Sequence, residues 1–210
     1  MRPAPVPVLA CLSRAALVGL AVACPAAVSA LALKVSVTDA RGKPLPDAVV
    51  ILEPATGRLP VKPMAQVDIA QNKRQFDPQL TVITVGTPVN FLNFDTVRHQ
   101  VYSFSPIKSF ELKLYTGVPT APVVFDKPGV AVLGCNIHDG MTAWVVVVDT
   151  PHYGRTPASG EVRIDGLAAG SYRLRAWHAN VPDGSEPAPQ PLNVHHGDVS
   201  VRLRLPTAPP

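Results

Sequence analysis

The sequence predicts an all-β fold, because three observations favour strands and turns over helices. From residue 33 onward, short segments alternate apolar and polar residues, and Gly- and Pro-rich turns separate them. The 210 residues include 24 prolines, and only 16% are charged, which suits a loop-rich β protein. After residue 30, no stretch has the 3.6-residue period of an amphipathic helix. Many short strands at close spacing are typical of a β-sandwich or barrel.

Residues 1–30 have the features of a secretory signal peptide. Arg2 and Arg14 make the start positive, residues 15–23 are almost entirely apolar, and Val28-Ser29-Ala30 offers a cleavage site. We therefore predict that the protein is exported, to the periplasm or beyond. Cleavage after Ala32 and lipid attachment at Cys24 are alternatives. A membrane anchor is less favoured, because the apolar run is short and Pro25 interrupts it.

Export changes the cysteine count and the net charge. Of three cysteines, Cys11 and Cys24 lie in the signal, so the mature chain keeps Cys135 alone. A lone cysteine in an oxidising compartment is buried and inert, paired between molecules, reactive, or a metal ligand. Removal of two arginines lowers the formal charge from +4 to about +2. That charge does not favour binding to nucleic acid or to an anionic membrane.

The first block of the mature chain contains two predicted strands. They are Leu33–Thr38, which alternates with period two, and Ala48–Leu52. Asp39-Ala40-Arg41-Gly42 is predicted as the turn between them, and residues 54–63 as a Pro-rich connector.

The second block, from about residue 64, contains eight predicted strands. Turn signals separate them at residues 85–88, 115–117 and 127–129. The strands are Gln66–Ile69, Gln79–Val85, Pro88–Asn93, Gln100–Phe104, Phe110–Leu114, Val123–Phe125, Val130–Gly134 and Ala143–Val148.

The third block comes after a connector at residues 149–158. Its predicted strands are Glu161–Ile164, Ser171–Trp177 and Val199–Leu205. Residues 166–170 are predicted to be a turn, and residues 181–191 a Pro-rich loop.

A candidate metal site lies at the end of the second block. Cys135, His138 and Met141 follow one another as C-x2-H-x2-M, which places a thiolate, an imidazole and a thioether in one short loop. A second imidazole is available from His99, which precedes the strand Gln100–Phe104. Two imidazoles, one thiolate and a weak axial Met describe a blue copper site. Each residue alone is more often a packed core or loop residue, but the joint order favours metal binding.

The other histidines are weaker candidates. His152 lies in a connector, His178 follows Trp177, and His195-His196 precede a glycine. Solvated loop histidines are the favoured interpretation, with an adventitious surface metal site at the pair as the alternative. Trp144 is interpreted as a core aromatic that could also shield the site.

The middle block, roughly residues 64–150, resembles the cupredoxins, most closely amicyanin and pseudoazurin. The matching pieces are V-G-T-P-V-N-F-L-N-F-D, H-Q-V-Y-S-F-S, F-D-K-P-G-V-A-V-L-G-C and C-N-I-H-D-G-M-T-A-W-V-V-V. The resemblance implies a Greek-key β-sandwich with one type 1 copper ion bound by His99, Cys135, His138 and Met141. The segment Asn93-Phe94-Asp95 is similar to the family's approach to its first histidine. Residues 103–112 depart from the family, which would alter the surface through which electrons pass.

The first and third blocks together resemble the transthyretin-like or carboxypeptidase-regulatory-like β-sandwich. The matching pieces are V-x-V-x-D-x-x-G-K-P-L-P-D-A-V-V and G-E-V-R-I-D-G-L-A-A-G-S-Y-R-L-R-A-W, with Ala168 where that family often has Pro. We predict a small discontinuous domain, residues 33–60 with 155–206, into which the cupredoxin block is inserted. The alternative is that the N-terminal strands extend the middle sandwich.

The function expected from these features is single-electron transfer by an exported blue copper protein. The sequence has no hydrolytic triad, no H-E-x-x-H and no Gly-rich phosphate loop, so we expect no enzyme. The whole chain also resembles exported proteins named for methylamine utilisation, a label that fixes no activity. The expected partner is a dehydrogenase or cytochrome, with electrons entering at the His138 edge framed by Pro106 and Ile107. The alternatives are copper delivery, or a structural β module with a vestigial loop.

Overall fold

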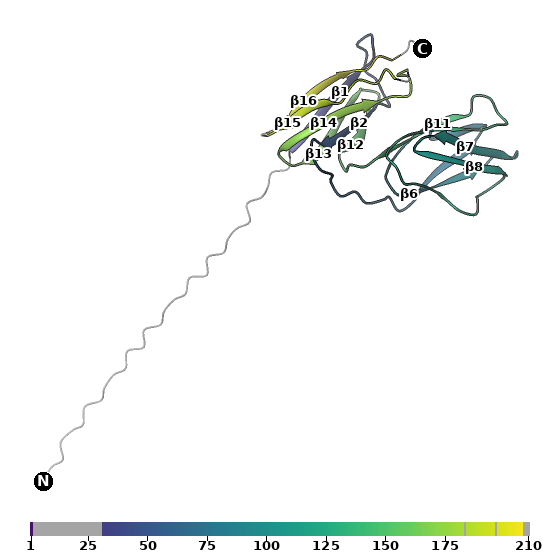
Figure 1. The fold of residues 1–210 in the computed structure, drawn as a ribbon, viewed down its shortest axis with the longest axis horizontal. Coiled ribbons are helices and arrows are strands. Elements are labelled where there is room, and N and C mark those ends of the chain that lie inside the picture. The colour runs from purple at the N-terminus through teal and green to yellow at the C-terminus, as the bar shows by residue number, and fades with distance from the viewer. Residues whose placement is uncertain (2–30, 183, 196, 208–210) are drawn as a thin grey trace.

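The computed structural model describes residues 1, 31–182, 184–195 and 197–207, so the predicted signal peptide lies outside the described part except for Met1. Over the described residues all regular elements are β-strands, sixteen in number, which confirms the all-β prediction (Figure 1). In this part of the chain there is also no helix long and apolar enough to cross a membrane.

Seven strands from the two ends of the described chain form two sheets. One sheet has the order β13-β1-β16, in which β1 pairs antiparallel with β13 and parallel with β16. The other has the order β12-β2-β14-β15, and all its pairings are antiparallel. The strands are β1 (Leu31–Thr38), β2 (Val49–Pro54), β12 (Tyr153–Arg155), β13 (Glu161–Leu167), β14 (Gly170–Trp177), β15 (Gln190–Val194) and β16 (Val199–Arg204).

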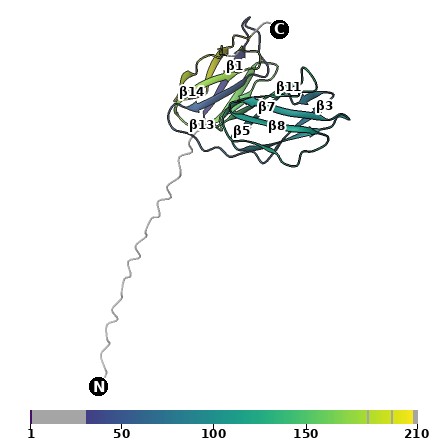
Figure 2. The same cartoon turned by 45° about the vertical axis from the view of Figure 1, so that its right-hand side comes forward.

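The nine strands between them form two further sheets beside the first pair (Figures 1 and 2). Their orders are β5-β11-β10-β7-β8 and β4-β3-β6-β9, and the parallel pairs are β5 with β11 and β3 with β6. The strands are β3 (Val67–Asn72), β4 (Gln75–Asp77), β5 (Leu80–Thr84), β6 (Thr87–Asn93), β7 (His99–Ser105), β8 (Lys108–Tyr115), β9 (Val123–Phe125), β10 (Gly129–Gly134) and β11 (Thr142–Val148).

Each pair of sheets encloses its own apolar core, and a third cluster joins the two pairs. The period-two alternation of β2 shows how this works. Val50 and Leu52 point into the core of the first pair. Val49 and Ile51 point the other way and pack in the third cluster, which includes Leu80 of β5 and two valines of β11. Both faces of β2 are therefore buried from Val49 to Leu52, which explains the continuous apolar run at these positions.

Three strands were not predicted, and each has a weak sequence signal. β4 has only three residues and comes after a turn at Lys73-Arg74 rather than a Gly- or Pro-containing one. β12 lies inside the predicted connector at residues 149–158, where it pairs with β2. β15 carries Pro191 inside the predicted Pro-rich loop and lies at the edge of its sheet, the position where a strand tolerates proline. The turn predicted at residues 166–170 is shorter, because β13 continues to Leu167.

Candidate metal centre

Two neighbouring strands and the loop after one of them carry the candidate ligands. His99 is the first residue of β7, and Cys135 directly follows the last residue of β10. β7 and β10 are antiparallel, and Gly134 pairs with Tyr102. The first residues of β7 and the last residues of β10 therefore lie close together, at the same end of the two strands. His138 lies in the loop between β10 and β11, and Met141 precedes β11 directly.

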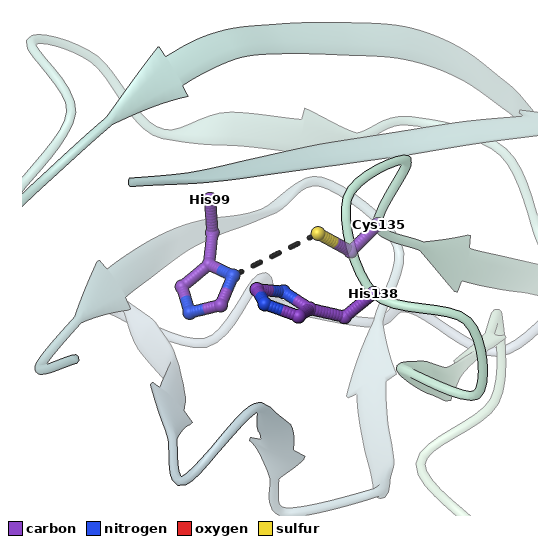
Figure 3. A group of neighbouring side chains, drawn as sticks. All are labelled: His99, Cys135 and His138. Atoms are coloured by element: carbon purple, nitrogen blue, oxygen red, sulfur yellow. Dashed lines mark hydrogen bonds between the residues drawn. The ribbon is translucent and has the colours of Figure 1, made fainter. Parts of the chain in front are cut away.

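The imidazoles of His99 and His138 and the thiol of Cys135 converge, as Figure 3 shows. The Cys135 Sγ and His99 Nδ1 atoms are 3.7 Å apart, and one ligand atom from each of the three residues lies within 4.8 Å of the others. The two imidazole centroids are 4.9 Å apart, with ring planes at 57°. Ligands bound at 2.0–2.3 Å to one ion lie about 3.5–4 Å from one another in a trigonal arrangement. The cluster therefore needs little rearrangement to hold an ion.

The hydrogen bonding of the cluster also fits a metal. The Nδ1 atom of His138 is buried and has no hydrogen-bond partner among the described residues. A buried polar atom without a partner is costly, and a metal ion within the cluster would satisfy it. His99 is fully buried, Cys135 is 6% exposed, and His138 is half-buried. The more accessible imidazole is thus the one on the loop.

Met141 is a buried residue in the lining of the hollow beside the ligand cluster. It is 3% exposed and borders the same hollow as Cys135 and His138. Its backbone N–H donates to the carbonyl of His138 at 3.2 Å, which closes a tight turn between the two residues. Gly140, between them, has φ of +89°, a conformation that glycine adopts without strain. The turn therefore brings Met141 back to the hollow that Cys135 and His138 also border.

Asp95 orients His99 from the side away from Cys135. Its Oδ2 lies 2.8 Å from His99 Nε2, so the remaining ring nitrogen, Nδ1, faces the thiol. The backbone N–H groups of Lys73 and Arg74 donate to the same carboxylate at 2.7 and 2.9 Å. Both residues have positive φ, which aims two successive N–H groups at one anion. A carboxylate that holds the outer nitrogen fixes the tautomer and direction of a metal-binding imidazole.

The charge of Asp95 is maintained by these contacts. Desolvation by itself would raise the pKa of Asp95. The hydrogen bonds from Arg74 N–H, the His99 ring and Lys73 N–H outweigh it and hold the pKa of Asp95 below its usual value. An ionised carboxylate accepts a hydrogen bond from the Nε2–H group of His99, so the His99 Nδ1 atom is free to bind a cation. No such role for Asp95 was expected from the sequence, although its spacing of four residues from His99 was visible.

A hydrogen-bonded loop fixes the segment that carries Asp95. The Asn93 side-chain amide donates to the carbonyls of Val97 and Tyr115, and its oxygen accepts from the backbone N–H of Asp95. Asn93 also pairs through its backbone with Gly117. The buried amide therefore ties the loop before His99 to the end of β8, which explains how that imidazole reaches a fixed position.

A half-buried phenol completes the surroundings of the cluster. The hydroxyl of Tyr115 donates to the carbonyl of Phe91 and accepts from the side chain of Gln71. Burial raises the pKa of Tyr115 to about 12; the hydrogen bond from Gln71 opposes this shift, and the nearby Cys135 adds to it. Tyr115 thus stays neutral and contributes a dipole rather than a charge beside the thiol.

The remaining candidates from the sequence lie elsewhere. His152 stacks edge-on against Tyr172, and His178 is buried beside β14. His195 is exposed, and His196 lies outside the described residues. Trp144 packs in the cluster between the two pairs of sheets rather than over the ligands.

One expectation about the surface is wrong. Ile107 does not frame His138, because its side chain lies against Gly129, at the start of β10. Cys135 comes after the other end of that strand. Ile107 and Pro106 form the turn between β7 and β8, and β7 leads away from His99 toward that turn. The strand directions therefore put the turn and the ligands at opposite ends of the sheet.

Comparison with known proteins gives similarities only among solved structures. No family model matches the chain, and no curated protein matches it. A purple cupredoxin from Nitrosopumilus maritimus is 23% identical, over 39% of this chain and 99% of that one, with a TM-score of 0.35. An amicyanin variant is 16% identical, over 41% and 92%, with a TM-score of 0.37. A copper-containing nitrite reductase from Thermus scotoductus is 23% identical, over 53% and 28%, with a TM-score of 0.38. At this level of similarity, what the chain binds depends on its own side chains.

Proposed function

We propose that this chain is an exported type 1 copper protein that carries single electrons between redox partners and is not itself an enzyme. One observation carries the proposal: His99, at the start of β7, and Cys135 and His138, in the loop after β10, place their ligand atoms within 4.8 Å of one another. Two imidazoles and a thiolate, with a thioether nearby, are the donors that blue copper sites use. The orphaned Nδ1 of His138 adds independent support.

The protein's own groups would each have a defined part at this site. Cys135 would bind as a thiolate, and His99 and His138 as neutral imidazoles through the nitrogens that face the cluster. Met141 would supply a weak thioether ligand. Asp95 would hold the ring proton of His99 at Nε2. When bound, copper supplies the one-electron couple, and the packed strands around it keep the ligands nearly fixed in both oxidation states.

Apolar side chains around the ligand loop support docking of a protein partner. Ile137, which directly precedes His138, is 47% exposed. Phe94 and Val97, in the loop before His99, are 66% and 40% exposed, and Val118, next to the residue that pairs with Asn93, is 65% exposed. A set of exposed apolar side chains near one site is typical of a protein-protein contact. We propose that a dehydrogenase or cytochrome docks here and exchanges electrons through the His138 edge.

The first test is the colour of the copper-loaded protein. One equivalent of Cu(II) added to metal-free protein should give intense visible absorption from thiolate-to-copper charge transfer. Cys135→Ser should abolish this absorption. His152→Gln, which changes a half-buried histidine far from the cluster in sequence, is the matched control and should keep it. A colourless complex in the unchanged protein would contradict the proposal and leave the structural role as the better interpretation.

A second test separates electron transfer from copper delivery. An electron carrier should retain copper against a chelator and should be reduced and reoxidised repeatedly without loss of the ion. Stopped-flow mixing with a cytochrome and dialysis against the chelator measure these two properties. Rapid loss of copper with slow reduction would favour delivery over the electron-carrier role.

Replacement of His138 by glycine tests the role of the accessible imidazole. His138→Gly should leave the three other ligands in place and open one position on the ion to added imidazole. Titration with imidazole should then restore the original spectrum. An unchanged response to imidazole in the variant and in the original protein would remove His138 from the ligand set.

We also propose that residues 33–60 and 155–206 form a transthyretin-like β-sandwich domain into which residues 64–150 are inserted, and that residues 1–30 are cleaved on export. The separate apolar cores of the two pairs of sheets support the first proposal. Sequencing of the mature N-terminus tests the second. A start at Leu31 is expected, and a start at Met1 in the periplasmic fraction would contradict cleavage.

A further inference from the structure

A hollow of about 440 Å³ lies beside the ligand loop. Tyr102, Phe104 and Val132 line it from the sheet, and Cys135, His138 and Met141 line it from the loop. One wall is made by β7 and β10, and the other by the loop from Cys135 to Thr142. Its volume falls in the range of about 300–1,000 Å³ that small-molecule sites occupy. The hollow is therefore large enough for a small organic molecule, and it adjoins the proposed metal site.

The sheet wall is aromatic. Tyr102 and Phe104 have ring centroids 5.0 Å apart and ring planes at 31°. The ring of Tyr102 lies over Gly134, where an added Cβ would come within 2.5 Å of its Cζ atom. Glycine at position 134 thus lets a ring lie flat on the strand that leads to Cys135.

Phe104 and Val132 leave apolar surface uncovered beside the hollow. Phe104 is 71% exposed and Val132 is 44% exposed. On the same sheet, Trp144 and Val146 are covered by the cluster that joins the two pairs of sheets. The β10–β11 part of this face is therefore apolar, and Phe104 and Val132 are the apolar side chains on it that the described chain leaves open.

Polar groups border the same hollow. Ser105 contributes a hydroxyl that accepts from the backbone N–H of Val132 at 2.9 Å and can donate its own proton elsewhere. Asp139 contributes a carboxylate and Thr142 a second hydroxyl from the loop side. Hydrogen-bonding groups around the hollow and ring faces on its sheet wall select a ligand with a π-face and hydroxyl groups at its edge.

We propose that this hollow binds a small planar aromatic molecule that carries hydroxyl groups, stacked on Phe104 and Tyr102 and hydrogen-bonded to Asp139 or Ser105. Binding to the metal-free protein tests this proposal without copper. Use of the bound molecule as a one-electron donor, which would lose an electron to Cu(II) and a proton to solvent, would rest on the proposed function.

Hydroquinone is a suitable probe. The metal-free full mature chain is the protein to use, in oxygen-free buffer, because neither copper nor air then oxidises the hydroquinone. Titration followed by ¹⁵N–¹H NMR should shift the amides of β7, β10 and the ligand loop, with a dissociation constant on the order of 1 mM for so small a ligand. Cyclohexane-1,4-diol has similar hydroxyl groups and no π-face, and it should bind at least about fivefold more weakly.

Phe104→Ala should weaken hydroquinone binding by about two- to tenfold. Phe104 is largely exposed, so this variant should keep its fold, which the NMR spectrum itself reports. Val124→Ala trims an exposed apolar side chain of β9 that does not border the hollow, and it should leave binding unchanged. Equal binding of the two diols, equal weakening by the two variants, or no shifts at 20-fold excess over the expected constant would each overturn the proposal.

Discussion

At the scale of single residues, replacement of Asp95 tests how much the orientation of His99 contributes to metal binding, because Asp95 contacts His99 but is not itself a proposed ligand. Its carboxylate joins His99 Nε2 to two backbone N–H groups of a neighbouring turn. Loss of such a carboxylate typically lowers metal affinity by about 10–100-fold. We therefore predict that Asp95→Ala binds copper about 10–100-fold more weakly, in competition titrations with a chelator, while keeping the thiolate colour at saturation.

The matched control for this variant is Asp126→Ala. Asp126 is an exposed carboxylate paired with Lys108 and should have no effect on copper affinity. Equal affinities in Asp95→Ala and the unchanged protein would show that the loop, rather than the carboxylate, orients His99.

His178 gives a second prediction at this scale, on the pH dependence of stability. Burial lowers the pKa of His178 below its ordinary value of 6.5, against the opposing effects of the Pro46 carbonyl and Asp47. Its Nδ1 also accepts the backbone N–H of Asn180 at 3.0 Å, a contact that a proton on Nδ1 would remove. The unfolded chain therefore takes up the proton first as the pH falls, so folded stability should decrease below about pH 6.5.

Urea unfolding at pH 7.5 and pH 5.5 measures this effect. His178→Gln should reduce the loss of stability between the two pH values. His195→Gln changes an exposed histidine and should not. If the free energy of unfolding changes with pH by the same amount in His178→Gln and in the unchanged protein, other groups cause the loss of stability at acid pH.

At the scale of elements, turns between strands set much of the local stability, and two glycines test this. Gly160 precedes β13 with φ of +70°, and a Cβ there would lie 2.7 Å from the carbonyl oxygen of Val37 and 3.0 Å from the backbone nitrogen of Leu45. Gly42 has a similar φ of +81° and open space around it. Alanine at position 42 should cost about 1–2 kcal/mol from backbone strain alone.

Alanine at position 160 adds a clash with backbone, which cannot move as the end of a side chain can. We therefore predict that Gly160→Ala lowers the free energy of unfolding by at least about 1 kcal/mol more than Gly42→Ala does. Urea denaturation followed by circular dichroism measures both. Equal losses would show that the β1–β13 junction shifts to accept the methyl group.

Elements were predictable where a strand has its own alternation or turn signal. Val123–Phe125 was predicted with its observed bounds, and β1, β6 and β11 within two residues. β12 and β15 were missed because partners, not local pattern, make them strands: β12 is held by β2, and β15 by β14. The loop motif from Cys135 to Met141 was readable for the same local reason. The meeting of His99 with Cys135 depends on strand pairing across the sheet, so sequence could suggest it but not supply its distance.

The position of Asp95 shows which part of the site could not be predicted from the sequence. Its spacing from His99 is visible in the sequence, yet its hydrogen bonds to Lys73 and Arg74 come from a turn more than twenty residues away. The error at Ile107 has the same origin. Both placements depend on the direction and register of neighbouring strands, which the residue pattern within one strand does not determine.

At the scale of the whole molecule, the cluster between the two pairs of sheets decides whether they unfold together. It includes Val49 and Ile51 of β2 and Leu80 of β5, and Arg155 adds a hydrogen bond from its guanidinium to the Leu80 carbonyl. Both tryptophans of the chain, Trp144 and Trp177, lie in this cluster. Tryptophan fluorescence therefore reports on the junction, whereas copper colour would report on the ligand cluster.

The Ile51→Ala variant tests whether the junction, followed by tryptophan fluorescence, unfolds separately from the ligand cluster, followed by copper colour. Ile51 is 1% exposed, and trimming it leaves a cavity at the junction while Val50 and Leu52 still fill the core on the other face of β2. Loss of such a side chain typically costs about 2–5 kcal/mol. In the copper-loaded protein, bound metal stabilises the unit that holds it. We predict that the variant loses its native tryptophan fluorescence at a lower urea concentration, while the copper colour disappears at nearly the unchanged concentration.

The control is Val132→Ala, which changes an exposed side chain of β10 and should move neither transition. If Ile51→Ala shifts fluorescence and colour together, the four sheets form one cooperative unit, and the proposed inserted domain has no independent stability.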